Sequence, residues 1–352
     1  MEEYLNHTIK TIRPLDNQAM EASRARQDNL TKPQGSLGRL EHLAIKIAGI
    51  RREARPVLEK KAIIVMAADH GVAEEGVSAY PQEVTRQMLH NFAQGTAAIN
   101  VLARLIGARV VVADIGVKSD MGPCQGIVNR KVAPGTRNIA RGPAMTREQA
   151  LQAIGVGIDV VQTEVARGLD IVGTGDMGIG NTTAAAAICA ATSGWPVQAV
   201  VGRGTGVDDV QLANKVRVVR QALEINQPDP GDPLDVLAKV GGLEIAGLVG
   251  VMLGAAAHRI PVVLDGLISG SAALIAAGLS PVAEGYFIAA HRSAEPGHKA
   301  VFAQLRSSPL LDLNMRLGEG TGAALGIFLA EAAVKTMNEM VTFDEAGVAR
   351  KK

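Results

Sequence analysis

Short, continuous apolar runs separated by helical stretches are the feature that most restricts what this sequence can fold into. The runs are rich in Val, Ile and Ala, and several of them end in Asp or Gly. They occupy residues 62–67, 109–114, 169–173, 199–202 and 260–266. Such runs are typical of strands that are buried on both faces. The helical patterns between them, such as 83–106 and 147–167, therefore predict an α/β fold with a largely parallel sheet.

The two ends of the chain lack these strand patterns and are mostly helical. Helical spacing is clear in the apolar residues Leu37, Leu40, Leu43, Ala44 and Ile47. We expect residues 1–60 and about 323–352 to pack together as a small helical domain. Residues 61–322 then form a large Rossmann-like domain, a parallel sheet flanked by helices, in which ligands collect at the carboxyl ends of the strands.

The composition is that of a globular protein and argues against several other classes. Of 352 residues, 47% are hydrophobic, 20% are charged and only 3% are aromatic, so the core must consist of Ala, Val, Ile, Leu and Met. A net charge of +1 without a basic run makes nucleic acid a poor candidate partner. Cys124 and Cys189 stand in no metal-binding spacing and are expected to be reduced thiols.

No segment predicts export or membrane insertion. The chain begins with Met1-Glu2-Glu3-Tyr4, without the basic and apolar regions of a signal peptide. Its most apolar stretch, 245–257, is shorter than the roughly 20 residues that a bilayer requires, so a buried helix is expected there. We therefore expect a cytoplasmic protein with no membrane partner.

The most informative segment for function is the run GTGDMGIGNTT at 173–183, which follows a predicted strand and precedes an Ala-rich helix. A glycine-rich turn at this position leaves backbone N–H groups free to bind a phosphate, assisted by the helix dipole. Gly178 and Gly180 would let the phosphate approach the backbone, and Asn181, Thr182 and Thr183 add side-chain donors. On these residues alone, a purely structural turn is nearly as good an explanation.

Two familiar nucleotide-binding motifs do not fit this segment. No Gly-Lys-Ser/Thr follows, which excludes a Walker loop. The glycines match Gly-x-Gly-x-x-Gly, but residues 195–201 supply no carboxylate for a ribose hydroxyl, so a single phosphate is favoured over a dinucleotide. A second glycine turn, 202–206, and Lys215 on the helix after it could complete the phosphate site, although most helix lysines are simply solvated.

Glu319 is the strongest candidate for acid–base chemistry. It lies between two glycines in the run RLGEG at 316–320, ahead of the apolar stretch 323–330. A nearby helix N-terminus would favour its anionic form, so a structural capping role is the alternative.

Two further segments, 67–72 and 291–298, are rich in histidine and carboxylate side chains. His70 and His291 compete with Glu319 as candidate bases. Their spacings fit no zinc motif, so a metal site is the second choice and no metal is expected.

Several segments together resemble the nicotinate-nucleotide:dimethylbenzimidazole phosphoribosyltransferase family. The matching runs are KPQGSLG at 32–38, DHGV at 69–72, GDMGIGNTT at 175–183, LDG at 264–266 and RLGEG at 316–320. Their common order, from about Thr31 to Ala330, is far more specific than any single run. The resemblance implies a homodimer whose subunits each combine a parallel-sheet α/β domain with a small helical domain made from both chain ends.

The resemblance also assigns roles to individual residues. It implies that Glu319 is the general base and that Leu317 touches the incoming aromatic base. Tyr80 and Met88 are further members of the base pocket, with Gln87 as an alternative to Met88. The residues implied to contact nicotinate mononucleotide and its phosphate are Asp176, Met177, Gly178, Ile179, Gly180, Asn181, Thr182, Gly204, Lys215 and Ser293. The family often has Glu at the position of Asp176.

The implied reaction moves ribose phosphate from nicotinate mononucleotide to dimethylbenzimidazole or a related base, giving α-ribazole phosphate and nicotinate for cobamide synthesis. Because the ribosyl carbon is bonded to a cationic pyridinium nitrogen, the leaving group needs no acid, and we expect no cofactor. The nearest acidic pair, Asp208-Asp209, lacks the Thr-Gly-Gly turn of enzymes that use phosphoribosyl pyrophosphate with magnesium. Two rival functions stay open: a nucleotide hydrolase on the same scaffold and a non-catalytic nucleotide-sensing protein.

Overall fold

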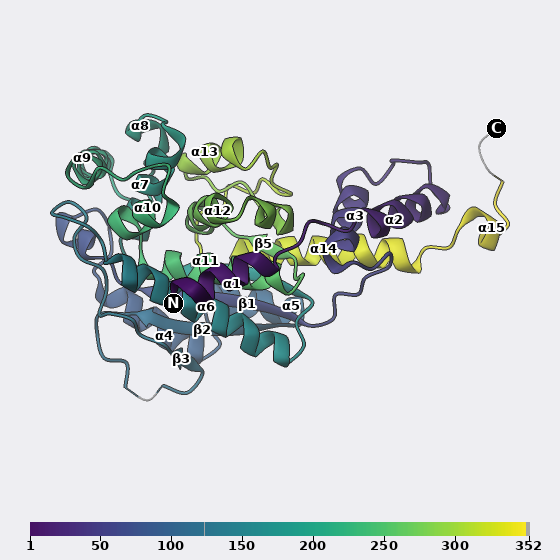
Figure 1. Cartoon of the computed structure of the whole chain (residues 1–352), viewed down its shortest axis with the longest axis horizontal. Helices are drawn as coiled ribbons and strands as arrows, with labels where there is room; N and C mark the ends of the chain where they lie inside the picture. The colour runs from purple at the N-terminus through teal and green to yellow at the C-terminus, as the bar shows by residue number, and fades with distance from the viewer. Residues whose placement is uncertain (123, 350–352) are drawn as a thin grey trace.

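The computed structural model, which describes residues 1–122 and 124–349, contains a six-stranded parallel sheet (Figure 1). Its strands are β1 Lys61–Ala68, β2 Ala108–Gly116, β3 Ile127–Asn129, β4 Ile171–Met177, β5 Val262–Leu264 and β6 Phe287–Ala289. Across the sheet they run β3-β2-β1-β4-β5-β6, and each pairing is parallel. This is the Rossmann order, which confirms the predicted fold class and places the topological switch point between β1 and β4.

The described residues form fifteen α-helices, some of which cover the two faces of this sheet. They are α1 Glu2–Thr11, α2 Asn17–Asn29, α3 Arg39–Arg51, α4 Glu83–Ala93, α5 Ala98–Leu105, α6 Arg147–Ala166, α7 Asn181–Ser193, α8 Val197–Val200, α9 Asp209–Asn226, α10 Pro233–Val240, α11 Leu243–Ala257, α12 Leu267–Leu279, α13 Gly297–Gln304, α14 Thr321–Glu339 and α15 Phe343–Ala346, with short 3₁₀ helices η1 Gly71–Glu75 and η2 Pro281–Tyr286. Helices α11 and α12 lie on one face of the strands, backed by α6, whereas α4, α5 and α14 lie on the other.

Strand β1 supplies side chains to two separate cores, because successive residues of a strand point to opposite faces. Ile64 and Met66 belong to the core shared with α6 and α11, whereas Ile63 and Val65 belong to the core shared with α3 and α14. All four are fully buried. Burial of such a side chain contributes about 1.5–3 kcal/mol, so two aliphatic cores stabilise the sheet with few aromatic residues.

Helices from the N-terminal and C-terminal parts of the sequence pack together beside the sheet. Helices α2 and α3 pack against each other and against α14, and this group extends to the right of the sheet in Figure 1. Helix α1 packs instead against α6 and α11. We propose that α2, α3 and the outer part of α14 are the small helical domain, which the sequence placed at 1–60 and about 323–352.

Two local predictions were wrong. The apolar run 199–202 is not a strand: it covers the end of α8 and the residues after it, where Val200 and Val201 are buried. Pro196 directly precedes α8, which suits a helix start, and so short an apolar run does not distinguish strand from helix. The helical stretch 83–106 is interrupted between α4 and α5, where Gly95 adopts a left-handed φ of 74°.

Other predictions are confirmed. Residues 245–257 belong to the buried helix α11. Both cysteines are free, with Cys189 buried and Cys124 partly buried. Strands β3 and β6, only three residues each, were not anticipated. None of the helices in the described part of the chain is long and apolar enough to cross a membrane.

Candidate active site

A cavity of about 260 Å³ lies at the carboxyl ends of the central strands, beside the switch point. It brings together ten of the predicted site residues: Tyr80, Asp176, Met177, Gly178, Ile179, Asn181, Thr182, Gly204, Ser293 and Leu317. The two glycine turns, 173–183 and 202–206, therefore face the same space, as expected. The rest of the wall comes mainly from 266–268, at the start of α12, and from 291–295.

The turn after β4 is shaped to expose a helix N-terminus to this cavity. Gly178 passes so close to the end of β1 that a Cβ there would lie 2.2 Å from the Ala68 carbonyl oxygen, so a side chain has no room. Gly180 is the N-cap of α7 and offers no side-chain cap to the first turn of the helix. The α7 N-terminus is therefore available to an anion such as phosphate.

Lys215 lies beside this helix start and is fully buried, not solvated. Its Nζ donates a hydrogen bond to Thr182 Oγ1 over 2.7 Å. Burial lowers the pKa of Lys215 to about 8, and the negative charge of Glu295 opposes that shift. A buried ammonium group at a helix N-terminus is a strong attraction for an anion, because both the charge and the backbone N–H groups are desolvated.

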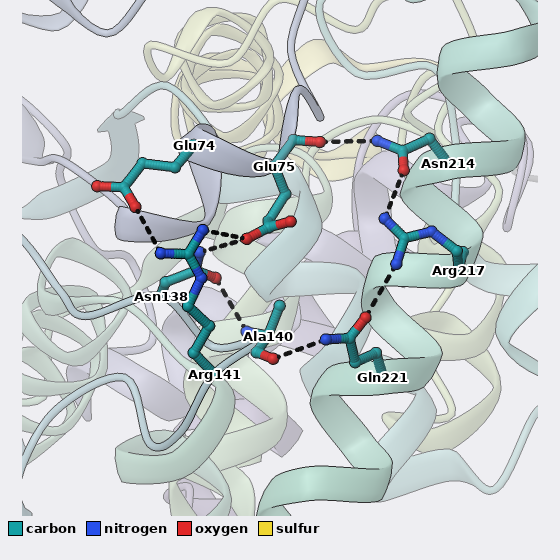
Figure 2. Close-up of polar contacts among 8 residues, drawn as sticks. All are labelled: Glu74, Glu75, Asn138, Ala140, Arg141, Asn214, Arg217 and Gln221. Atoms are coloured by element: carbon teal, nitrogen blue, oxygen red, sulfur yellow. Dashed lines mark hydrogen bonds and ion pairs between the residues drawn. The ribbon is translucent and has the colours of Figure 1, made fainter.

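A polar network fixes helix α9, which carries Lys215 (Figure 2). Asn214 Nδ2 donates to the Glu75 carbonyl oxygen over 2.7 Å, and Gln221 Nε2 donates to the Ala140 carbonyl oxygen over 2.9 Å. Arg217 lies between these two side chains and donates to both, over 2.8 Å to Asn214 and 2.9 Å to Gln221. The network ties α9 to η1 and to the 138–141 loop, and so holds the backbone that presents Lys215.

Glu319 occupies a strained loop that is tightly braced. Its φ is 62°, in the left-handed region that a side chain disfavours. The loop lies directly on β4, where a Cβ at Gly175 would be 2.5 Å from the Glu319 carbonyl oxygen. Asp265, after β5, accepts hydrogen bonds from the N–H groups of Gly320, Gly322 and Ala323. This buried carboxylate caps α14 and fixes the position of Glu319.

Leu317 and Gly318 line the cavity and lead directly into Glu319, whose own side chain is buried and does not form part of the wall. Glu319 Oε2 accepts a hydrogen bond from the Ile99 N–H, 3.3 Å away, at the N-terminus of α5. Burial raises the pKa of Glu319, and the Asp265 charge adds to the rise against the opposing effect of the Ile99 N–H. A carboxylate with a raised pKa is a better proton acceptor once ionised.

Comparison with known proteins identifies the family of this chain. A family model described as phosphoribosyltransferase matches residues 12–348. The nicotinate-nucleotide–dimethylbenzimidazole phosphoribosyltransferase of Desulforudis audaxviator is 58% identical over 350 residues, covering 99% of both chains, and that of Chloroflexus aggregans is 60% identical over 348 residues, also covering 99% of both. This chain belongs to that phosphoribosyltransferase family.

Solved structures in the family have the same fold. The crystal structure of the nicotinate-nucleotide–dimethylbenzimidazole phosphoribosyltransferase from Thermus thermophilus is 45% identical, with a TM-score of 0.91 over 96% of this chain and 100% of that one. The crystal structure of CobT from the same organism is 46% identical, with a TM-score of 0.92 over 95% of this chain and 100% of that chain.

Among the cavity residues of this phosphoribosyltransferase that were missed as site residues, two hold the second glycine turn. Glu295 Oε1 accepts a hydrogen bond from the Gly204 N–H over 2.8 Å, and Arg316 donates to the Gly204 carbonyl oxygen over 2.7 Å. Together they hold the second glycine turn across the cavity. Both belong to segments noticed for other reasons, but their common partner, Gly204, is about 90 or more residues away in the chain.

The remaining predicted residues lie elsewhere or in other roles. On α4, Gln87 is exposed and Met88 is half-buried against the core shared with α14, and neither lines this cavity. His70 forms a buried pair with Glu244, with 2.6 Å between Nε2 and Oε1. Within residues 1–122 and 124–349, no three His, Cys, Asp or Glu side chains are grouped so as to hold a metal ion.

Asp176 is a buried carboxylate at the end of β4, where the turn into α7 begins. Asn181 Nδ2 donates to its Oδ2 over 2.9 Å. Burial, followed by the charges of Asp265 and Glu244, raises the pKa of Asp176 well above its ordinary value. The residue is therefore suited to carry a proton and to donate a hydrogen bond inside the cavity.

Proposed function

We propose that this protein transfers the ribose phosphate of nicotinate mononucleotide to dimethylbenzimidazole or a related base, releasing nicotinate and forming α-ribazole phosphate for cobamide synthesis. The observation that carries the proposal is one cavity whose wall contains both Thr182, at the α7 N-terminus, and Leu317 and Gly318, from the braced Glu319 loop. The ammonium group of Lys215 lies directly behind Thr182, to which it donates a hydrogen bond. Membership of the phosphoribosyltransferase family supports it.

The chemistry follows from the charges of the two reactants. In nicotinate mononucleotide the ribosyl carbon is bonded to a pyridinium nitrogen, and breaking that bond returns the electron pair to nitrogen and neutralises it. A ring nitrogen of the incoming base attacks the opposite face of the ribose and forms the new bond, which inverts the configuration to α. Glu319 accepts the proton that the other ring nitrogen loses, help that is typically worth roughly 10²–10⁴-fold.

Binding of the phosphate positions the nucleotide for reaction. Lys215 and the α7 N-terminus hold the phosphate at one end of the nucleotide, so the ribosyl carbon is presented at a fixed distance from them. Such positioning replaces an encounter between free molecules and can lower the activation barrier by several kcal/mol. For ideally oriented groups the effect reaches about 7–11 kcal/mol.

Incubation with nicotinate mononucleotide and a panel of bases, analysed by mass spectrometry, tests this function. The expected products are nicotinate and a ribosylated base, formed equally well in EDTA because the pyridinium already activates the leaving group. Free ribose phosphate instead would identify a nucleotide hydrolase, and binding without turnover would identify a nucleotide sensor. The panel also decides which base is preferred.

We further propose that the protein acts in the cytoplasm as a homodimer. Val101 and Leu105 on α5 and Phe328 on α14 are apolar side chains that are more than half exposed, and these two helices pack together. Apolar side chains gathered on neighbouring helices are suited to a subunit interface. Light scattering coupled to size-exclusion chromatography is expected to give twice the 36.7 kDa chain mass.

A further inference from the structure

Thr85 connects helix α4 to the turn at residues 178–180, which we call the phosphate turn because of its proposed role. It lies in the first turn of α4 and is fully buried. Its Oγ1 accepts a hydrogen bond from the Ile179 N–H over 3.1 Å. Ile179 is the middle residue of Gly178-Ile179-Gly180, the turn that leads into the α7 N-terminus. The bond therefore joins two segments that are 94 residues apart in the chain.

The peptide between Gly178 and Ile179 is held at both ends. Its carbonyl oxygen accepts from the Asn181 N–H over 3.1 Å, and its N–H donates to Thr85. Because a peptide unit is planar, these two bonds fix the orientation of the whole unit. The Ile179 N–H is thereby directed into the protein, and the orientation of the N–H groups that follow it is determined.

On its other side, Thr85 faces the end of strand β1. Burial raises the pKa of Asp69, which follows that strand, and the Lys118 N–H and the nearby Thr85 hydroxyl oppose the rise. Asp69 is itself held by the Lys118 N–H, which donates to Oδ2 over 2.8 Å. The Thr85 hydroxyl thus accepts a hydrogen bond from the phosphate turn next to a buried carboxylate that is itself fixed to the backbone.

The segment before α4 reaches the cavity as well. Tyr80 lines the cavity, and Gln82 Nε2 donates to the His70 carbonyl oxygen over 3.0 Å. The start of α4 is therefore attached both to the β1 end and, through Thr85, to the phosphate turn. A change at Thr85 would alter the position of the phosphate turn relative to Tyr80, on the side of the cavity that is proposed to bind the aromatic base.

We propose that Thr85 is a positioning residue, which orients the Gly178–Ile179 peptide so that the remaining N–H groups of the turn and the α7 N-terminus face the nucleotide phosphate. The proposal rests on the proposed function for the identity of the nucleotide. The contact itself is independent of that identity and concerns any phosphate bound at the turn.

Two comparisons isolate the hydroxyl group: the wild type with Thr85→Val, and Thr85→Ser with Thr85→Ala. Thr85→Val keeps the shape of threonine and removes the acceptor. Thr85→Ala and Thr85→Ser both lose the methyl group, but only Ser keeps the hydroxyl. Since one hydrogen bond is at stake, Val and Ala are expected to raise the KM for nicotinate mononucleotide about 3- to 10-fold, with the KM for the base nearly unchanged and Ser close to the wild type.

Calorimetric titration with inorganic phosphate provides a readout that does not depend on turnover. Weaker phosphate binding by Val and Ala, but not by Ser, supports the proposal even if the wild type proves to be a hydrolase or a sensor. Equal effects of Ala and Ser on both KM and phosphate affinity would overturn it, because packing of the methyl group would then be responsible. Unchanged phosphate affinity in folded Val and Ala variants would overturn it too.

Discussion

The two sides of the cavity are built differently. On the phosphate side, Lys215 is fully buried and bonded to Thr182, and α9 is tied down by its own polar network. On the side expected to receive the base, Tyr80 and Leu317 are 56% and 60% exposed. Because desolvating a cation is costly, a buried cation that binds an anion has to be held in place by the fold before the ligand arrives. Exposed side chains need no such arrangement, since an aromatic ligand can cover them when it binds. The side proposed to bind the nucleotide phosphate is therefore more rigidly organised than the side proposed to bind the base.

The largest effect is expected at Glu319, in the loop whose Leu317 and Gly318 line the cavity. Glu319→Gln keeps the shape and the contact with the Ile99 N–H but removes the proton acceptor. Turnover should fall by at least roughly 10²-fold, the lower end of the general-base range. Nucleotide affinity and melting temperature should stay near those of the wild type, as measured by calorimetry and thermal unfolding.

Two outcomes would make Glu319 a structural residue. One is a Gln variant that keeps most of its turnover, and the other is activity lost in proportion to unfolding. In either case the carboxylate serves to cap α5, the role that its bond to Ile99 already suggests. Neither side of the cavity would then have an identified general base.

A smaller effect is expected from Lys215→Ala. A charge-assisted contact is worth roughly 1.5–3 kcal/mol, so the KM for nicotinate mononucleotide should rise about 10-fold or more, while the KM for the base changes little. Lys239→Ala is the matched control, because it removes a lysine of α10 that pairs with Asp235. Equal changes in both KM values would mean that Lys215 supports the fold and not the phosphate.

The pH dependence of nucleotide affinity is a second test of whether the charge of Lys215 binds the phosphate. Lys215, with a pKa of about 8, is cationic below that pH and loses its charge above it. Nucleotide affinity should therefore be flat near neutral pH and fall as pH rises beyond 8, by no more than about 10-fold at pH 9. Isothermal titration from pH 6.5 to 9.5 measures this change. The decline should be absent in Lys215→Ala, and a decline that persists there would have to come from another group.

The phosphate side was also the more predictable side. Gly178 to Thr182 are contiguous in the sequence, and a glycine-rich turn between a strand and a helix has a known physical use, so the turn was found from local pattern. The burial of Lys215 was not, because it depends on α9 packing beside α7, which no local pattern records. Thr85, Glu295 and Arg316 act through partners roughly 90 or more residues away, and their individual residue types carry no signal.

The smallest effect is expected on the base side. Leu317 is mostly exposed and lines the cavity, so a bound base would cover part of its side chain. Leu317→Ala removes some of that apolar contact and should raise the KM for dimethylbenzimidazole about 2- to 5-fold, with the nucleotide KM unchanged. Leu313→Ala is the control, since Leu313 is 53% exposed but does not line the cavity.

Competition between dimethylbenzimidazole and adenine should shift in the Leu317 variant alone, because the larger apolar base loses more contact. If Leu317→Ala instead weakens nucleotide binding, the exposed side of the cavity belongs to the nucleotide, and the division into a prebuilt phosphate side and an adaptable base side is wrong.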